Sequence, residues 1–131
     1  MLRHQAEMNP GDPEQYAKEN PGVVVRDLDR LWGRRPGLLA HAICHAAEHA
    51  NLDTLDDLRQ AIDTKYLGYR YAIVVEAAFQ AVHALACRCP DKYLDWARSV
   101  LEKPLSHPCH PGVLEVVNEI LEDLNENPPG I

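Results

Sequence analysis

The stretch from Tyr69 to Cys87 constrains the fold most, because its apolar residues cover almost the whole circumference of a helix. Such a helix is stable when other elements surround it, so the stretch predicts a central, buried helix. Glu76, Gln80 and His83 interrupt the apolar run. They keep it below the roughly 20 apolar residues that a membrane span requires. The stretch therefore predicts the core of a helical domain rather than a membrane anchor.

Five further segments show helical spacing with one apolar face, and turn-forming residues separate them. Pro36 and Pro111 each stand where a helix begins, since proline suits a first helical turn, and Thr54 predicts an N-cap. No segment alternates between polar and apolar residues as a half-buried strand does. We therefore predict an all-α fold of five to seven helices. Besides 69–87, the predicted helices run over 23–32, 37–50, 55–63, 92–102 and 111–125.

Residues 1–22 differ from the rest because they are polar and carry several prolines and glycines. They predict a loose N-terminal arm with at most one helical turn at Pro13–Lys18, followed by a single helical domain over 23–131. The first residues lack the apolar core of a signal peptide, so we expect a cytoplasmic protein. Its four cysteines should then be reduced rather than paired in disulfides.

The 131-residue chain is acidic, with 20 acidic and 13 basic side chains and a formal net charge of −7. This charge argues against a nucleic-acid partner, because phosphate binding needs a basic surface. The excess is uneven: residues 1–35 are balanced, whereas residues 36–131 hold fourteen acidic and seven basic side chains. From Gly112 to Ile131 there are five acidic residues and no lysine or arginine. The last helix is thus predicted to steer basic partners toward the protein.

The helices form three pairs, and two of the pairs carry a similar pattern. LDDLRQAID at 55–63 precedes the alanine-rich YRYAIVVEAAFQAVHALA at 69–86, and YLDWARSVLEKP at 93–104 precedes HPGVLEVVNEILEDL at 110–124. These segments resemble HEAT-type repeats. The resemblance implies a short stack of helical hairpins whose second helices line a concave binding surface. The segment 103–111 predicts a rigid proline-rich loop, which departs from the tight turn of such repeats and leaves an irregular helical bundle open.

Polar residues form a narrow stripe on the otherwise apolar central helix. Glu76, Gln80, His83 and Cys87 fall within about 60° of one another at 100° per residue. Glutamates also follow one side of the last helix. If second helices line one groove, both stripes face it. The predicted partner-binding residues are Glu76, Gln80, His83, Glu115, Glu119 and Glu122.

The helix over 37–50 carries His41, Cys44, His45 and Glu48 within about 100° of one another. Imidazole, thiolate and carboxylate are donors that zinc and iron accept. The alternative prediction is therefore a metal-binding helical protein, and an enzyme if the metal is catalytic. Its ligands would be His41, His45, Glu48, Glu76 and His83. The zinc motif H-E-x-x-H is absent, since Glu48-His49 has the reverse order and no partner histidine is in frame, so we expect no cofactor.

A second cluster lies in the proline-rich segment, where His107, Cys109 and His110 are close in sequence. Cys87 and Cys89 could lie nearby, but one residue separates them, which is not the C-x-x-C spacing of zinc sites. The combined spacing matches no familiar zinc finger. We interpret the segment as a stiff loop whose histidines cap neighbouring helices.

The sequence favours a non-enzymatic protein–protein binding module. Small size and acidity fit an immunity protein that neutralises a basic toxin, or a phage-type inhibitor. We expect a basic protein partner, and neither a nucleic acid nor a membrane. A second candidate surface comprises Arg34, Arg35, Tyr66 and Tyr69, because arginine and tyrosine are common at interface hot spots.

Overall fold

The computed structural model describes residues 12–20, 22, 25–106 and 110–129. These residues form seven α-helices and two 3₁₀ turns, and no strand occurs among them. The helices are α2 (Pro13–Glu19), α3 (Val25–Trp32), α4 (Pro36–His49), α5 (Leu55–Thr64), α6 (Ala72–Arg88), α7 (Pro90–Ser106) and α8 (Pro111–Glu126). The 3₁₀ turns are η1 (Leu52–Thr54) and η2 (Tyr66–Gly68). The predicted all-α fold is confirmed.

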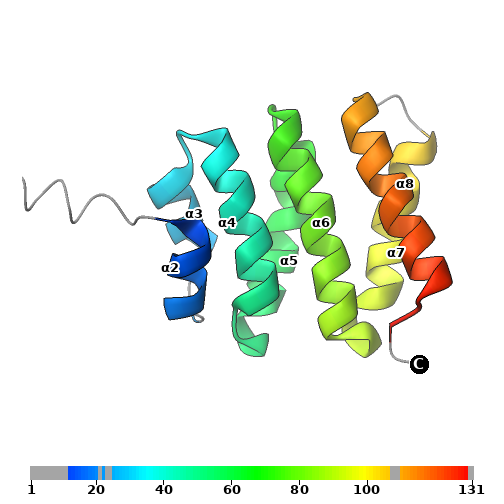
Figure 1. Cartoon of the computed structure of the whole chain (residues 1–131), viewed down its shortest axis with the longest axis horizontal. Helices are drawn as coiled ribbons and strands as arrows, with labels where there is room; N and C mark the ends of the chain where they lie inside the picture. The colour runs from blue at the N-terminus through cyan, green and yellow to red at the C-terminus, as the bar shows by residue number, and fades with distance from the viewer. Residues whose placement is uncertain (1–11, 21, 23–24, 107–109, 130–131) are drawn as a thin grey trace, which may run out of the picture.

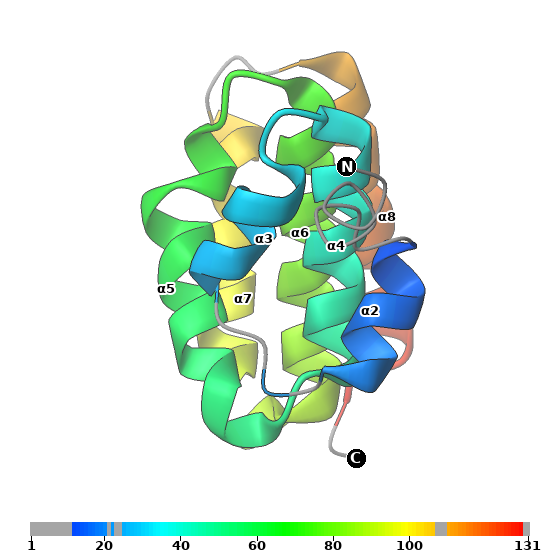
Figure 2. The same ribbon diagram turned by 90° about the vertical axis from the view of Figure 1, so that its left-hand side faces the viewer.

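The helices form two layers. Helices α4, α6 and α8 lie side by side in one layer, with α3, α5 and α7 behind them (Figure 1). The side view shows the same division and places α2 against α4 (Figure 2). Each of the three predicted helix pairs contributes one helix to each layer. We call the surface of α4, α6 and α8 that points away from the other layer the open face.

Helix α6 is the centre of the packing, as its sequence predicts. It contacts α4 on one side and α8 on the other, and it also packs against α5 and α7. Val74, Ala78, Val82 and Leu85 are completely buried. Buried alanines are frequent in both α4 and α6, which contact each other, and small side chains let two helix backbones approach closely. Among the described residues, every buried side chain is hydrophobic, so the core offers no partner to a charge.

The N-terminal region contains a packed helix. Asp12 caps α2 by accepting a hydrogen bond from the Glu14 amide at 3.4 Å. Pro13 and Ala17 are buried, and the ring of Tyr16 meets Trp32 edge to face at 5.2 Å. The range predicted as a loose arm therefore includes a helix that belongs to the helical body. The cause is one small apolar face with helical spacing, which the surrounding prolines obscure in the sequence.

The start of α6 and the end of α7 differ from their predicted positions, and α6 begins at Ala72 rather than at Tyr69. Helix α7 extends to Ser106, so Pro104 lies inside its last turn instead of in the predicted loop. A proline near a helix end removes only one backbone donor, and the helix continues past it. Thr54 precedes α5 as predicted, but its hydroxyl donates to the Asn51 carbonyl at 2.8 Å and makes no cap hydrogen bond. The η1 turn before α5 explains this difference, because Thr54 already has helical backbone angles.

A lysine–tyrosine pair ties α3 to the end of α5. Asp29 of α3 accepts a hydrogen bond from the Tyr66 hydroxyl at 3.1 Å and forms an ion pair with Lys65. The Lys65 ammonium also lies 5.7 Å from the centre of the Tyr66 ring. The hydroxyl of this fully buried tyrosine thus has a charged partner.

The same arrangement ties α5 to α7. Asp56 accepts a hydrogen bond from the Tyr93 hydroxyl at 2.7 Å and from Lys92 at 2.8 Å. The two lysine–tyrosine pairs belong to the tripeptide Lys-Tyr-Leu, which occurs at 65–67 and at 92–94. This repeat, which is absent from the predicted motifs, marks both contacts between successive helices of the rear layer.

Candidate functional site

A pocket of about 310 Å³ lies on the open face, between the three helices of that layer. Its walls are mixed: apolar side chains alternate with a carboxylate, an amide, an imidazole and a thiol. The lining residues are Ala40, His41, Cys44, Ile73, Glu76, Ala77, Gln80 and Val116. The pocket therefore brings together polar residues of α4 and α6 that the sequence analysis places on two separate stripes.

Glu76 lies at the α8 side of the pocket, beside the beginning of that helix. A Cβ atom on Gly112 would lie 2.6 Å from Glu76 Oε1, so glycine gives the carboxylate this close approach. The Gly112 amide donates to Nδ1 of His110 at 3.0 Å, which caps α8. A carboxylate near a helix N-terminus is electrostatically favourable. Glu76 thus lies at the rim of the pocket, where the N-terminus of α8 is a favourable neighbour for its carboxylate.

His83 also lies between α6 and α8, but it has a partner. Its Nε2 atom is 2.8 Å from Oδ2 of Asp123, and the His83 side chain is half-buried. Of the three predicted binding residues on α6, Gln80 is exposed, Glu76 lines the pocket, and His83 joins two helices. His83 is therefore the least free of the three to contact a partner.

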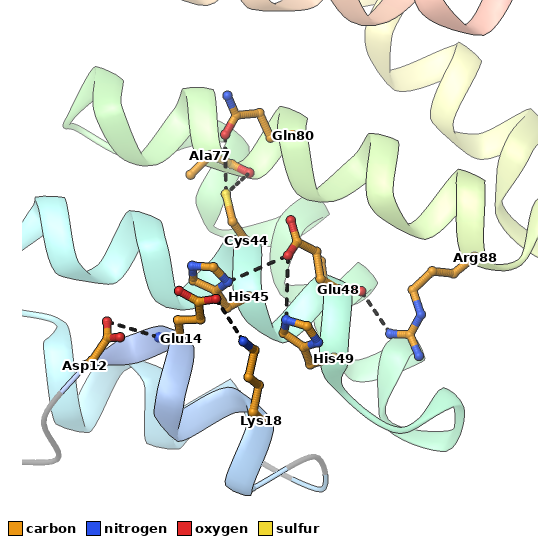
Figure 3. A network of polar contacts seen from close by, with 11 residues as sticks. Asp12, Glu14, Lys18, Cys44, His45, Glu48, His49, Ala77, Gln80 and Arg88 are labelled. Carbon is orange, nitrogen blue, oxygen red and sulfur yellow. Dashed lines mark hydrogen bonds and ion pairs between the residues drawn. The ribbon is translucent and has the colours of Figure 1, made fainter. Parts of the chain in front are cut away.

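The open-face layer carries the excess negative charge. Helices α4, α6 and α8 contain seven acidic residues and one basic residue, whereas α3, α5 and α7 contain eight acidic and six basic residues. The single arginine, Arg88, donates a hydrogen bond to the Ala47 carbonyl at 2.9 Å (Figure 3). The acidic residues of this layer are Glu48, Glu76, Glu115, Glu119, Glu122, Asp123 and Glu126.

The three predicted binding residues of α8 are fully available. Glu115, Glu119 and Glu122 are exposed, and none of them forms an ion pair with another described residue. In the rear layer, by contrast, Asp29 and Asp56 each accept hydrogen bonds from a lysine and a tyrosine. Asp29 and Asp56 of the rear layer thus serve the fold, whereas Glu115, Glu119 and Glu122 of α8 face solvent.

Cys44 is a neutral thiol at the pocket wall. Its Sγ atom lies 3.4 Å from Oε1 of Gln80 and 3.7 Å from the Ala77 carbonyl (Figure 3). Burial raises the pKa of Cys44 to about 11, and the charge of Glu48 adds to this shift. Since the thiolate is the nucleophile, this cysteine is poorly suited to covalent catalysis.

Alkylation is expected to separate Cys44 from Cys87. At pH 8, about one in a thousand Cys44 side chains would be a thiolate, since the pKa of this residue lies about three units higher. Cys87 is exposed on the same helical layer, although burial also raises its pKa. We expect iodoacetamide to modify Cys44 at least tenfold more slowly than Cys87 in the folded protein, as measured by peptide mass spectrometry. Equal rates in native protein would contradict the burial of Cys44.

A group of three ligand-type side chains lies on α4. His45, Glu48 and His49 each offer one atom, and these atoms all lie within 4.8 Å of one another. The prediction that no histidine is in frame with Glu48-His49 is wrong, because His45 completes the order H-x-x-E-H. Among the described residues, His41, Glu76 and His83 belong to no such group of three. The predicted five-residue metal site is therefore not assembled in this arrangement.

The other predicted clusters are resolved in part. His107 and Cys109 lie outside the described residues, whereas His110 caps α8, as the interpretation of that loop predicts. In the second candidate surface, Tyr66 is completely buried and cannot contact a partner. Arg34 and Arg35 are exposed.

No protein-family model matches the chain, and no curated protein or solved structure is detectably similar to it. Within the part of the chain that the structure describes, no helix is long and apolar enough to cross a membrane. The fold therefore defines an all-α protein of two packed helical layers. Its function has to be argued from the open face and its charges.

Proposed function

We propose that the protein is a non-enzymatic, HEAT-like binding module that holds a basic protein partner on its open face. The observation that carries this proposal is the unequal charge of the two layers. A net charge of −6 on α4, α6 and α8 contrasts with −2 on α3, α5 and α7, and the pocket lies in the more acidic layer. Helical-repeat proteins bind ligands on such a surface of adjacent helices.

The pocket suits the side chain of a lysine or arginine. Ile73 and Val116 offer apolar walls for the methylene groups, and Ile73 is 46% exposed. Glu76 and Gln80 offer oxygen acceptors for the cationic end. One basic side chain of the partner would enter this pocket. The exposed glutamates of α8 would then steer the rest of the basic surface.

An immunity protein against a basic toxin, or a phage-type inhibitor, would use such a surface. Both act by covering a basic protein, and neither requires a catalytic group. Charge complementarity speeds the encounter between inhibitor and target, which matters most when the target is harmful. This role agrees with the high pKa of Cys44, which disfavours a thiolate nucleophile in the pocket.

Charge reversal on α8 is expected to slow association with a basic partner. The variant Glu115→Lys/Glu119→Lys/Glu122→Lys changes three exposed side chains and leaves the core intact. With a fluorescent arginine-rich peptide as the probe, stopped-flow measurements at low salt should show an association rate lower by at least fivefold. The circular-dichroism melt should stay almost unchanged. Physiological salt should weaken wild-type binding, because exposed charges are screened beyond about 8 Å.

A matched variant separates the open face from net charge alone. Asp57, Asp95 and Glu102 are exposed on the rear layer, and reversing all three to lysine changes the total charge equally. We expect this variant to slow association less than twofold. If both triple variants slow association equally, the peptide responds to net charge and the open face is not the binding site.

A further inference from the structure

We infer that α4 carries a site for a divalent transition metal of the zinc type, formed by His45, Glu48 and His49. This site is separate from the pocket, since none of the three residues lines it. Oε2 of Glu48 lies 3.7 Å from Nδ1 of His45 and 3.7 Å from Nε2 of His49 (Figure 3). One carboxylate oxygen thus lies within 4 Å of two imidazole nitrogens.

These distances are close to those of a formed site. Zinc bonds to nitrogen and oxygen are about 2.0–2.1 Å long, so the ligand atoms of a tetrahedral ion lie roughly 3.4 Å apart. The two measured separations of 3.7 Å exceed this value by a few tenths of an ångström. All three atoms already lie within 4.8 Å of one another. Side-chain rotation would therefore have to close at most about 1.4 Å between any two of these atoms before all three bond one ion.

Helical spacing produces this arrangement. Residues three and four positions apart lie on the same side of a helix, so Glu48 and His49 both neighbour His45. The rings of His45 and His49 are nearly parallel, with 7° between their planes and 6.1 Å between their centres. The two rings therefore project in the same direction from adjacent turns. The H-x-x-E-H order is one through which zinc enzymes present two histidines from a helix.

A buried, unsatisfied nitrogen gives independent support. Nδ1 of His45 is inaccessible to solvent and has no hydrogen-bond partner in the structure. Such an atom is rare in folded proteins, because a buried polar group without a partner is costly. The nearest acid, Glu48, is beyond hydrogen-bond distance at 3.7 Å. A metal ion between the two would give both groups a partner.

The surrounding charges favour a cation. Glu14 of α2 interacts electrostatically with His45 and His49, and Lys18 pairs with Glu14 at 3.0 Å. The surroundings of the two histidines thus hold two carboxylates, Glu14 and Glu48, and one ammonium, Lys18. Their summed charge is negative, which favours a cation. Two nitrogens and one carboxylate suit zinc, nickel or copper better than calcium or magnesium.

The fold does not depend on this ion. Helix α4 is held by buried residues such as Leu39, Ile43 and Ala47, which pack against neighbouring helices. Three protein ligands also leave a coordination position for a solvent molecule or another ligand. A chelator should therefore remove the metal without unfolding the protein.

Metal titration of the full chain, purified without a histidine tag, tests the site. We expect isothermal titration calorimetry to show one Zn²⁺ per chain. His45→Ala, His49→Ala and Glu48→Gln should each weaken binding at least tenfold, and His83→Ala should weaken it less than twofold. His83 is the matched control because it is a half-buried histidine that pairs with Asp123 instead. Circular dichroism should confirm that each variant is folded, and His49→Ala carries the test if His45→Ala unfolds.

Two rival sites have distinct outcomes. His41 and His45 are also four residues apart with stacked rings, so His41→Ala would weaken binding tenfold if that pair held the ion. We expect less than a threefold effect. With Co²⁺ as the probe, an intense sulfur-to-metal charge-transfer band would assign the ion to cysteine. Either result, or no stoichiometric Zn²⁺ binding by the wild-type chain, would overturn the inference.

Discussion

Replacing Ala78 by glutamate is expected to abolish the cooperative melt of the protein. Ala78 is completely buried in α6, and it lies opposite the polar stripe because two residues advance a helix by about 200°. A carboxylate there would have no charged partner, since no charged residue is buried in the described core. The hydroxyls of the buried tyrosines Tyr66 and Tyr93 already bond to Asp29 and Asp56. An uncompensated buried charge costs about 3–5 kcal/mol, and overpacking adds about 1–3 kcal/mol. Domains of this kind have about 5–15 kcal/mol of stability in total.

Gln80→Glu is the control for this substitution. It adds the same charge to the same helix, but Gln80 is exposed. Surface substitutions usually change stability by less than about 0.5 kcal/mol. Urea denaturation followed by circular dichroism should therefore show a wild-type-like transition for Gln80→Glu and none for Ala78→Glu. A stability loss below about 1 kcal/mol for Ala78→Glu would mean that α6 is not the centre of the core.

The sequence predicts those elements whose signals are local. The apolar circumference of 69–87 identifies α6 as central, and Pro36 and Pro111 place two helix boundaries to within a residue. Proline acts through its own ring and its missing amide, so its effect is readable without knowing the tertiary structure. Helix α2 is too short for such a signal to stand out. Its stability depends on contacts with α4 and Trp32 instead.

The interactions between helices were harder to predict. His83 belongs to a polar stripe in the sequence. Nothing local indicates that its ring nitrogen forms a hydrogen bond with Asp123, forty residues later. The hydrogen bonds that Asp29 and Asp56 accept likewise join residues about 36 positions apart. In contrast, His45 and His49 are four residues apart, and their relation was readable from helical spacing alone. The polar lining of the pocket was partly predictable, because Glu76 and Gln80 share one face of α6.

The two tyrosines of the rear layer predict a loss of stability at alkaline pH. Burial raises the pKa of Tyr66, and the charge and hydrogen bond of Asp29 add to this effect. Burial also raises the pKa of Tyr93, with the hydrogen bond and charge of Asp56 as further causes. Because the folded pKa exceeds the unfolded value of about 10, the stabilisation is complete below pH 10 and is lost as the pH rises above it.

The expected size of this loss is large. For each pH unit above 10 at which a tyrosine stays protonated in the folded protein, the free energy of unfolding falls by about 1.4 kcal/mol. Tyr66 would remove about 3 kcal/mol by pH 12, which is a large part of the total stability of a small domain. Tyr93 would add a smaller loss, because its partner Asp56 is exposed to solvent. Urea denaturation at intervals from pH 8 to pH 12 measures the loss directly.

Phenylalanine at both positions should reduce the stability advantage of the wild type at high pH. The variant Tyr66→Phe/Tyr93→Phe loses two hydrogen bonds to carboxylates, each worth about 1.5–3 kcal/mol, so it should be less stable than the wild type at pH 8. It has no phenol to ionise at these sites, so its stability should fall less steeply between pH 10 and pH 12. The two stability curves should therefore converge as the pH rises. The buried contacts with Asp29 and Asp56 predict that the two tyrosine hydroxyls ionise only when the protein unfolds. Parallel stability curves over this range would contradict that prediction and show that other groups cause the alkaline transition.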